Sequence, residues 1–288
     1  MSVDVEDYFM VEAFAESAPR NSWDTWPSRV VTSTKRTLEL LDKHHVKATF
    51  FFVGWIAQKF PSLVREVHVR GHEIACHSFW HRPVYSLTPQ EFRDDTRMAI
   101  RAIEDAAGTK VYGYRAPSWS ITKKCLWALD ILAEEGFSYD SSIYPIRHDL
   151  YGIPGARRFP YAYKAQNGKI LREFPPTSVR IAGQNLPAAG GGYLRVFPLV
   201  YTRWVFRKYE NVYREGVVVY FHPWELDPEQ PRMRGKLKSH LRHYTNLDRM
   251  EERLNFVLQT YGFGTFLSVM NLGTDNASVG PKIDDKML

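Results

Sequence analysis

Two histidines, His77 and His81, stand four positions apart in the segment GHEIACHSFWH (residues 71–81), directly after a short apolar run. If the chain turns helical here, both imidazoles share one face, with roughly 5–6 Å between their Cβ atoms. Ring nitrogens at such a separation can bind one metal ion at about 2.0–2.1 Å. Because such a pair is also common by chance, the metal-site hypothesis depends on residues elsewhere in the chain.

Other residues suited to acid–base chemistry follow short apolar segments that we expect to be strands. They are Asp4, Glu6, Asp7, Arg115, Asp140 and His222. One carboxylate and two neutral imidazoles suit a divalent metal such as zinc. A second carboxylate can accept a proton from a water that the metal has made acidic, and a separate histidine can protonate a departing amine. The chain has a candidate for each of these roles.

Each of these residues also has a purely structural interpretation. The early acidic residues could cap a loop, Arg115 could form a plain ion pair with Asp140, and His222 could be a satisfied histidine at a strand end. We favour the functional interpretation because every cluster follows an expected strand. The C-terminal ends of parallel strands are where α/β proteins place their chemistry.

The elements that must position these residues alternate regularly up to about residue 145. We expect strands at 2–7, 46–53, 73–76, 111–115 and 137–140, and helices at 34–43, 61–70, 88–107 and 126–135. The clearest helix start has Thr88 as the N-cap, Pro89 in the first turn and Glu91 three residues after the cap, and Gly108 ends that helix. Pro- and Gly-rich loops are expected from about 146 to 200, followed by a strand at 217–221, a helix at 247–258 and a last strand at 264–269.

Composition limits the classes of function. With 288 residues, 44% hydrophobic and 24% charged, the chain is typical of one globular α/β domain. The longest apolar stretch, residues 48–57, is too short to cross a bilayer, and no leader precedes the first strand, so a cytoplasmic protein is expected. The net charge of +6 favours an anionic partner. The basic run at 232–243 is expected to be a solvated segment or a contact for an anionic glycan, since no nucleic-acid-binding module is present.

Several short motifs occur in the order typical of one enzyme family. They are VDVEDY (3–8), GHEI (71–74), HSFWH (77–81), YRAP (114–117), YDSS (139–142) and YFHPWE (220–225). This series resembles the polysaccharide deacetylase family with the NodB homology domain, carbohydrate esterase family four. GGGY (190–193), FHPWELD (221–227) and RHYTNL (242–247) resemble the branch associated with bacterial exopolysaccharide loci.

The resemblance implies a distorted (β/α) barrel in a single domain over residues 1–270, with the branch-specific region from about 146 integrated into it and a frayed tail at 271–288. It implies a metal-dependent hydrolase, with zinc as the expected ion, that removes N-acetyl groups from the sugars of a bacterial polysaccharide. The roles it implies are Asp4 as general base oriented by Arg115, His77 and His81 as metal ligands, and His222 as general acid supported by Asp140.

The third metal ligand and the substrate contacts complete the set of candidate residues. Glu6 is preferred as the ligand because Asp4 and Glu6 face the same side of a regular strand. Asp7 is the alternative if the strand breaks at Glu6. The contacts expected for the sugar are Trp119, Pro117 and Trp224, since flat rings beside a catalytic site can stack on sugar faces.

Two other functions stay open. A glutamate where many family members have an aspartate leaves room for a C–N hydrolase of the allantoinase or cyclic imidase kind, which acts on a small cyclic amide. An inactive carbohydrate-binding relative is the second alternative. The complete set of acid, base and metal-ligand candidates argues against pure binding.

Overall fold

The computed structural model describes residues 1–272. An eight-stranded sheet has the order β10-β1-β2-β3-β4-β5-β7-β6, and its neighbouring strands are parallel except for the antiparallel β6–β7 pair. Its strands are β1 (Ser2–Val5), β2 (Thr49–Phe52), β3 (Glu73–Cys76), β4 (Gly113–Tyr114), β5 (Tyr139–Asp140), β6 (Tyr161–Lys164), β7 (Ile170–Glu173) and β10 (Tyr220–Phe221). A separate hairpin consists of β8 (Ser178–Ile181) and β9 (Gln184–Pro187). The curled parallel sheet confirms the predicted distorted (β/α) barrel.

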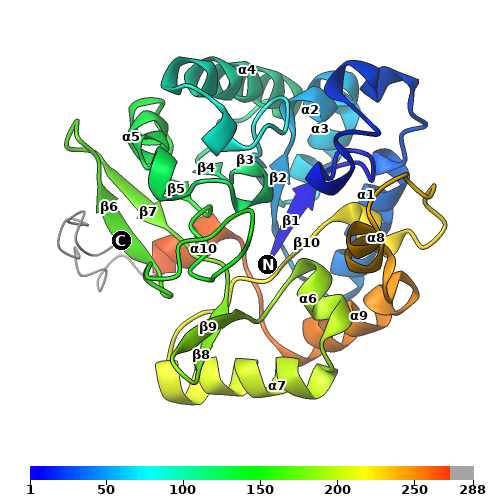
Figure 1. Cartoon of the computed structure of the whole chain (residues 1–288), viewed down its shortest axis with the longest axis vertical. Coiled ribbons are helices and arrows are strands. Elements are labelled where there is room, and N and C mark those ends of the chain that lie inside the picture. Colours follow the sequence, from blue (N-terminus) through cyan, green and yellow to red (C-terminus); the bar gives the residue numbers. More distant parts are fainter. Residues whose placement is uncertain (273–288) are drawn as a thin grey trace.

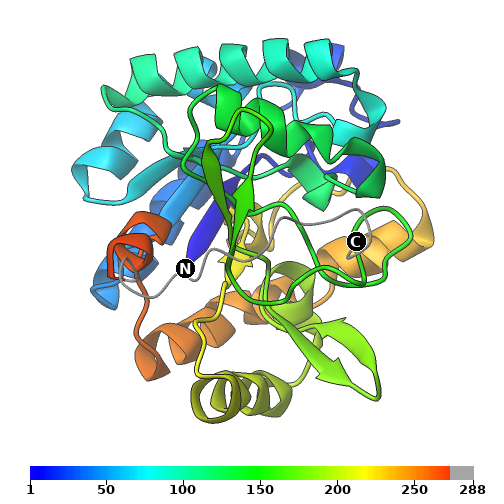
Figure 2. The same cartoon turned by 90° about the vertical axis from the view of Figure 1, so that its left-hand side faces the viewer.

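Helices surround the sheet in Figures 1 and 2, with α4 along one side and α7 beside the β8–β9 hairpin on the other. They are α1 (Val30–Lys43), α2 (Gly54–Lys59), α3 (Pro61–Val69), α4 (Pro89–Ala107), α5 (Trp127–Glu134), α6 (Gly191–Val196), α7 (Leu199–Lys208), α8 (Leu237–Tyr244), α9 (Met250–Thr260) and α10 (Phe266–Leu272). Among residues 1–272, none of them combines the length and apolar character needed to cross a membrane.

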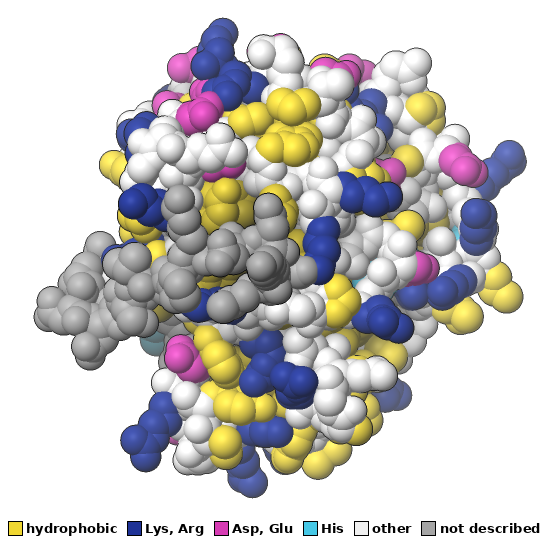
Figure 3. All heavy atoms as spheres, turned by 60° about the vertical axis from the view of Figure 1, so that its left-hand side comes forward, with side chains coloured by type: hydrophobic (Ala, Val, Ile, Leu, Met, Phe, Trp, Pro, Cys, Tyr) yellow, Lys and Arg dark blue, Asp and Glu magenta, His cyan; other side chains and the backbone are white. Residues whose placement is uncertain are grey.

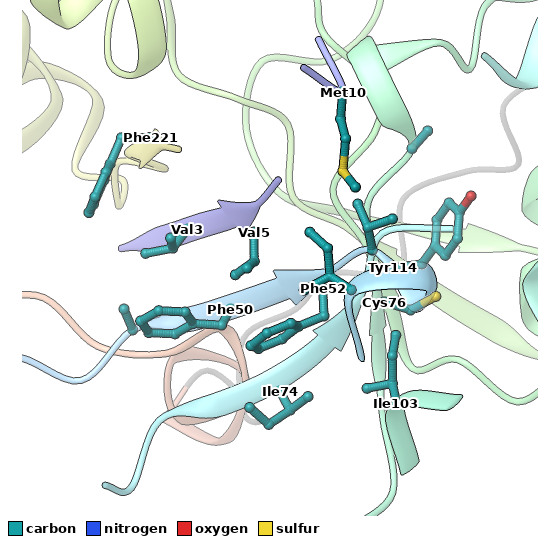
Figure 4. Packing of buried hydrophobic residues seen from close by; sticks show 14 of the residues in the cluster. Val3, Val5, Met10, Phe50, Phe52, Ile74, Cys76, Ile103, Tyr114 and Phe221 are labelled. Carbon is teal, nitrogen blue, oxygen red and sulfur yellow. The ribbon is translucent and has the colours of Figure 1, made fainter. Parts of the chain in front are cut away.

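The register of the central strands explains both the core and the placement of the polar residues. Val3 pairs with Phe50, which pairs with Ile74, and all three side chains belong to the buried cluster drawn in Figure 4. Because successive residues of a strand face opposite sides, Ser2 and Asp4 face away from this cluster. Burial of such apolar side chains stabilises the sheet by about 1.5–3 kcal/mol each. The polar residues that follow the strands therefore start from rigid positions.

The predicted start of α4 is confirmed. The Thr88 side chain accepts a hydrogen bond from the backbone of Glu91, whose carboxylate accepts one from the Thr88 N–H at 2.8 Å, so the capping box is complete. Gly108 ends the helix in the left-handed conformation, with φ of 70°.

Two predictions about the second half of the chain are wrong. The region expected to be loops contains β6–β9 and α6. Residues 266–269 of the strand expected at 264–269 instead belong to α10. The first N–H groups of this helix donate to two buried side chains: Phe266 N to Thr49 Oγ1 (2.9 Å) and Leu267 N to Glu73 Oε2 (3.1 Å). These acceptors satisfy a helix start that the local sequence does not indicate. Of the predicted 271–288 tail, 271–272 belong to α10 and 273–288 lie outside the described residues.

Candidate functional site

Glu6 lies between the two histidines of the first motif. Its Oε1 is 3.1 Å from His77 Nε2 and 3.0 Å from His81 Nε2, and all three side chains are buried. One ligand atom from each residue lies within 4.8 Å of the other two. Glu6 follows the end of β1 and His77 follows β3, so the curled sheet brings together residues 71 positions apart. A carboxylate and two imidazoles in this arrangement match the donor set of a divalent metal site.

The two histidines do not share a helix face, because the chain does not turn helical here. Residues 77–83 form a loop in which Ser78 (φ 58°) and His81 (φ 51°) adopt left-handed conformations. Asp95 of α4 fixes the loop by accepting hydrogen bonds from the N–H groups of Phe79 (2.8 Å) and Trp80 (3.2 Å). Such strained backbone persists only where the surroundings determine it, and it is enriched at functional sites.

The orientation of His77 is set from the next strand. Its Nδ1 lies 2.7 Å from the backbone oxygen of Arg115, which follows β4. A carbonyl can only accept, so Nδ1–H donates to it and Nε2 carries the lone pair in the neutral ring. That tautomer presents Nε2 toward Glu6, as ligand histidines are oriented in metal sites.

Asp4 forms a buried ion pair with Arg115, whose Nη1 donates to Asp4 Oδ1 at 2.6 Å. Arg115 is itself completely buried and also donates to Ser2 Oγ (2.9 Å) and Ser141 Oγ (3.0 Å). Its guanidinium lies over the Phe51 ring at 4.1 Å. With this many partners, Arg115 is rigid and compensates the charge of a carboxylate beside the Glu6 cluster.

The carboxyl of Glu6 is in its ionised form. Burial raises its pKa, but the neighbouring His81 and His222 and the close contacts with the ring nitrogens of His77 and His81 outweigh burial and bring the pKa well below its ordinary value. Glu6 is therefore held as a carboxylate anion, which is the form that binds a metal ion.

His222 follows β10, which pairs with β1, and its Nε2 is 3.6 Å from Glu6 Oε1. Its Nδ1 is 2.8 Å from Glu225 Oε1, and Glu225 Oε2 accepts a hydrogen bond from Arg195 Nε at 2.5 Å. Burial lowers the pKa of His222, but Glu6 and Glu225 outweigh burial and raise it to about 9. Burial raises the pKa of Glu225, but Arg195 and His222 bring it down to about 2.

Asp140 does not support His222, which corrects the assignment made from the sequence. Within the described part of the chain its carboxylate accepts hydrogen bonds from Ser142, through Oγ at 2.5 Å and N at 3.2 Å, and lies beside Glu173. Burial raises the pKa of Asp140 to about 6, and burial together with Asp140 raises that of Glu173 well above its usual range. Burial beside Asp140 therefore favours the protonated form of Glu173.

Asp7, the alternative metal ligand, points elsewhere. Its carboxylate accepts hydrogen bonds from Ser28 Oγ (2.5 Å) and from the backbone N–H groups of Arg29 (3.1 Å) and Val30 (3.3 Å) at the start of α1. It thus acts as a helix cap supplied from a distant segment. The structure places Glu6, not Asp7, against the histidines.

The residues proposed to contact sugar are largely buried. Trp119 is 6% exposed, packs against Tyr144 and Tyr220, and covers Arg115 at 4.7 Å. Trp224 is also 6% exposed, and its ring stacks between His222 (4.9 Å) and His243 (4.1 Å). Pro117 is buried as well. Sugar contact by these residues stays a prediction.

Sequence reasoning missed Glu225 and Arg195. The signal for Glu225 was present, because a glutamate three residues after His222 and just past a proline has the spacing of a capping box. Arg195 lies 30 residues earlier in α6, and no local pattern connects it with His222.

Comparisons with known proteins divide the chain into two regions. Residues 21–136 match the model of the polysaccharide deacetylase family, and residues 141–271 match a domain of unknown function, DUF3473. The first match includes His77, His81 and Arg115, but not Asp4, Glu6 or His222.

Curated relatives align with part of the chain. A peptidoglycan deacetylase of Helicobacter pylori is 29% identical over 38% of this chain and 36% of its own length. A chitooligosaccharide deacetylase of Bradyrhizobium is 32% identical over 35% of this chain and 43% of its own length. A peptidoglycan-N-acetylglucosamine deacetylase of Bacillus cereus is 28% identical over 45% of this chain and 53% of its own length. The chain thus spans about a third to a half of these relatives.

Solved structures extend the likeness to most of the fold. A presumed polysaccharide deacetylase from Mycobacterium smegmatis has a TM-score of 0.63 at 20% identity and covers 94% of this chain and 88% of its own. The allantoinase Puue has a TM-score of 0.59 at 16% identity, over 85% of this chain and 74% of its own. At these identities the likeness is one of fold alone.

Proposed function

We propose that this chain, in which residues 21–136 form a polysaccharide deacetylase domain, removes N-acetyl groups from the sugars of a bacterial exopolysaccharide or related glycan. The observation that supports this most directly is the contact of Glu6 Oε1 with the ring nitrogens of both His77 and His81. Relatives named peptidoglycan and chitooligosaccharide deacetylases favour an N-acetylated glycan as the substrate.

We assign a divalent cation, with zinc as the first choice, to Glu6, His77 and His81. Their chemistry fits the ion, because one carboxylate and two oriented imidazoles lie within 4.8 Å of one another in a buried site. When bound, such an ion makes a water molecule acidic and polarises the carbonyl of an acetamide group.

Asp4 has the position of a general base. Arg115 binds its Oδ1, which leaves Oδ2 to accept the proton of the attacking water. The fixed guanidinium keeps the carboxylate in place when it takes up this proton. Since Arg115 also supplies the carbonyl that orients His77, one residue positions both the base and a metal ligand.

His222 has the position of a general acid. Its Nδ1 lies 2.8 Å from Glu225 Oε1, so Nδ1–H donates to Glu225, and this carboxylate stabilises the protonated ring. The Nε2–H, on the side of Glu6, is then the one available to protonate the departing amine. The side chain is 19% exposed. Solvent water can therefore protonate His222 again after it has given up this proton.

Acetate release from N-acetylglucosamine oligomers tests the proposal. We expect the purified protein to release acetate, to lose this activity after chelation, and to regain it when zinc is added back. No release from a protein that keeps a tightly bound metal would contradict the glycan substrate and favour a small cyclic amide. A protein that binds no metal under any condition would contradict the assignment of Glu6, His77 and His81.

A further inference from the structure

Positive charge is concentrated in residues 154–214. This segment has eleven Lys and Arg and only two acidic residues, Glu173 and Glu210, which gives it a net charge of +9. The whole chain has a net charge of +6, so the rest of the chain is net negative. Residues 141–271, which match a domain of unknown function, have a net charge of +9, whereas the deacetylase match at 21–136 has a net charge of +3.

A pocket of about 520 Å³ lies within this basic segment, where the loop 154–160 meets the β8–β9 hairpin. Arg157, Arg158 and Arg180 line it together with small and neutral residues, and the lining includes no acidic side chain. In Figure 3, several dark blue Lys and Arg side chains lie in the lower part of the molecule among yellow ones, and Figure 1 places β8, β9 and α7 in that part. The pocket thus combines a concave shape with unbalanced positive charge.

The arginines of the pocket are available to a ligand. Arg157 and Arg180 are exposed, and neither forms an ion pair with another residue of the described chain. Arg158 is better fixed: its guanidinium lies over the rings of Phe159 (4.8 Å) and Tyr213 (4.7 Å), and its Nη1 donates to the Ser178 carbonyl at 3.3 Å. Guanidinium groups bind carboxylates through paired N–H···O contacts, for which this arrangement leaves donors free.

A short series of contacts connects the pocket with the candidate active site. Asn185 of the pocket donates from Nδ2 to the carbonyl of Pro145 at 2.8 Å. The neighbouring residue, Tyr144, packs against Trp119 at 5.5 Å, and Trp119 covers Arg115 at 4.7 Å. The backbone N–H of Ile153 donates a hydrogen bond to the Tyr144 carbonyl at 2.8 Å and so joins the ends of the loop 144–153. The residues that follow, 154–160, form one wall of the pocket. A group bound in the pocket would therefore be attached to the framework that holds Asp4 and His77.

We propose that the pocket lined by Arg157, Arg158 and Arg180 binds a carboxylate group of an acidic polysaccharide, as a second contact for the glycan that the candidate active site deacetylates. The inference rests on the proposed function, because a glycan substrate is what brings an acid-bearing polymer to this surface. An anionic membrane is the other large partner to consider. Two apolar side chains of α7, Val200 and Trp204, are 71% and 42% exposed, as in proteins that bind a bilayer surface. The concave shape of the arginine pocket favours the glycan, because a flat bilayer surface does not enter a recess.

Binding of polygalacturonate oligomers to the full chain tests the inference by calorimetry at low ionic strength, with chitin oligomers as the neutral comparison. The double variant Arg157→Gln/Arg180→Gln should weaken polygalacturonate binding about tenfold, because it removes two charge-assisted contacts. The matched control Arg65→Gln/Arg101→Gln removes the same charge from exposed positions on α3 and α4, and should change binding less than about twofold.

Three outcomes would overturn the inference. They are equal weakening by both double variants, no polygalacturonate binding by the unmodified protein, and tight capture on anionic phospholipid vesicles that Arg157→Gln/Arg180→Gln leaves unchanged. Acetate release from neutral N-acetylglucosamine oligomers is measured in parallel and should be the same for the unmodified protein and both double variants. Failure of the proposed function would abolish acetate release in the unmodified protein, whereas failure of the pocket inference would leave it intact.

Discussion

Replacing Glu225 with glutamine removes one negative charge from a buried series of contacts that runs from Arg195 to His222. Glu225 Oε1 accepts the backbone N–H of His222 at 3.1 Å and lies 2.8 Å from its Nδ1, while Oε2 accepts from Arg195 Nε at 2.5 Å. Glutamine keeps the shape and one acceptor oxygen. The substitution therefore tests the charge of this side chain more than its packing.

The magnitude follows from what remains after the charge is lost. Removing one partner of a buried ion pair costs about 3–5 kcal/mol, and we expect about 3 kcal/mol in the free energy of unfolding, because Arg195 still donates to two backbone carbonyls. A hydrogen bond to a charged group is worth about 1.5–3 kcal/mol, so kcat should fall about 10- to 150-fold if Glu225 supports a protonated His222. The pKa of His222, about 9, should fall toward its ordinary value. Because a general acid works only when protonated, the alkaline decline in rate should move to lower pH.

Acetate release as a function of pH, together with metal content and urea unfolding, measures these effects. Asp140→Asn is the matched control, since Asp140 is equally buried but is hydrogen bonded to Ser142 instead of His222. We expect the control to leave the alkaline limb of the pH profile unchanged. An equal shift of that limb in both variants, or an unchanged profile in Glu225→Gln, would refute the assignment of Glu225 as the partner of His222.

Three further outcomes are expected. Glu6→Gln should lose bound metal. Asp7→Asn should keep the metal and lower the free energy of unfolding by about 1 kcal/mol, because a helix cap is lost. Metal analysis and urea unfolding check both variants, and metal loss in Asp7→Asn alone would reverse the choice of ligand. His77→Ala should lose metal and activity, whereas His222→Ala should keep the metal and lose turnover, and equal metal loss in both would contradict the general-acid role. Burial lowers the pKa of His243 to about 3, so His243 stabilises the fold above its ordinary pKa of about 6.5, and this stability is lost as the pH falls. Between pH 7 and pH 5 the free energy of unfolding should fall by about 2 kcal/mol more in the unmodified protein than in His243→Gln, as measured by urea unfolding. Equal falls in the two proteins would show that His243 is not the group responsible.

Local signals predicted the elements well where those elements are decided locally. The Thr88 and Glu91 capping box and the glycine at 108 define α4 without reference to the rest of the molecule. The helix α10 is different, because its first N–H groups are satisfied by Thr49 and Glu73, about 200 residues away. A sequence window cannot include such acceptors, so the local pattern predicts a strand where the chain forms a helix.

The candidate site shows the same division between local and distant causes. Spacing alone marked His77 and His81, but the helix that it suggested is a loop fixed by Asp95 of α4. The register of β1 favoured Glu6 over Asp7, and the structure indeed turns Asp7 away toward the start of α1. These two outcomes depend on contacts with elements 15 to 23 residues further along the chain. Composition and periodicity do not indicate which side chains will meet across such a separation.

The position of β10 brings the second matched region to the candidate site. It pairs with β1 at the edge of the sheet, with Val3 beside Phe221, so the next residue, His222, arrives next to the strand that carries Asp4 and leads to Glu6. Glu225 and Arg195 also lie within residues 141–271, outside the deacetylase match. The candidate general acid and both residues that hold it thus come from the region of unknown function. A fragment that ends near residue 136 would keep His77, His81 and Arg115 but would have no proton donor at this position.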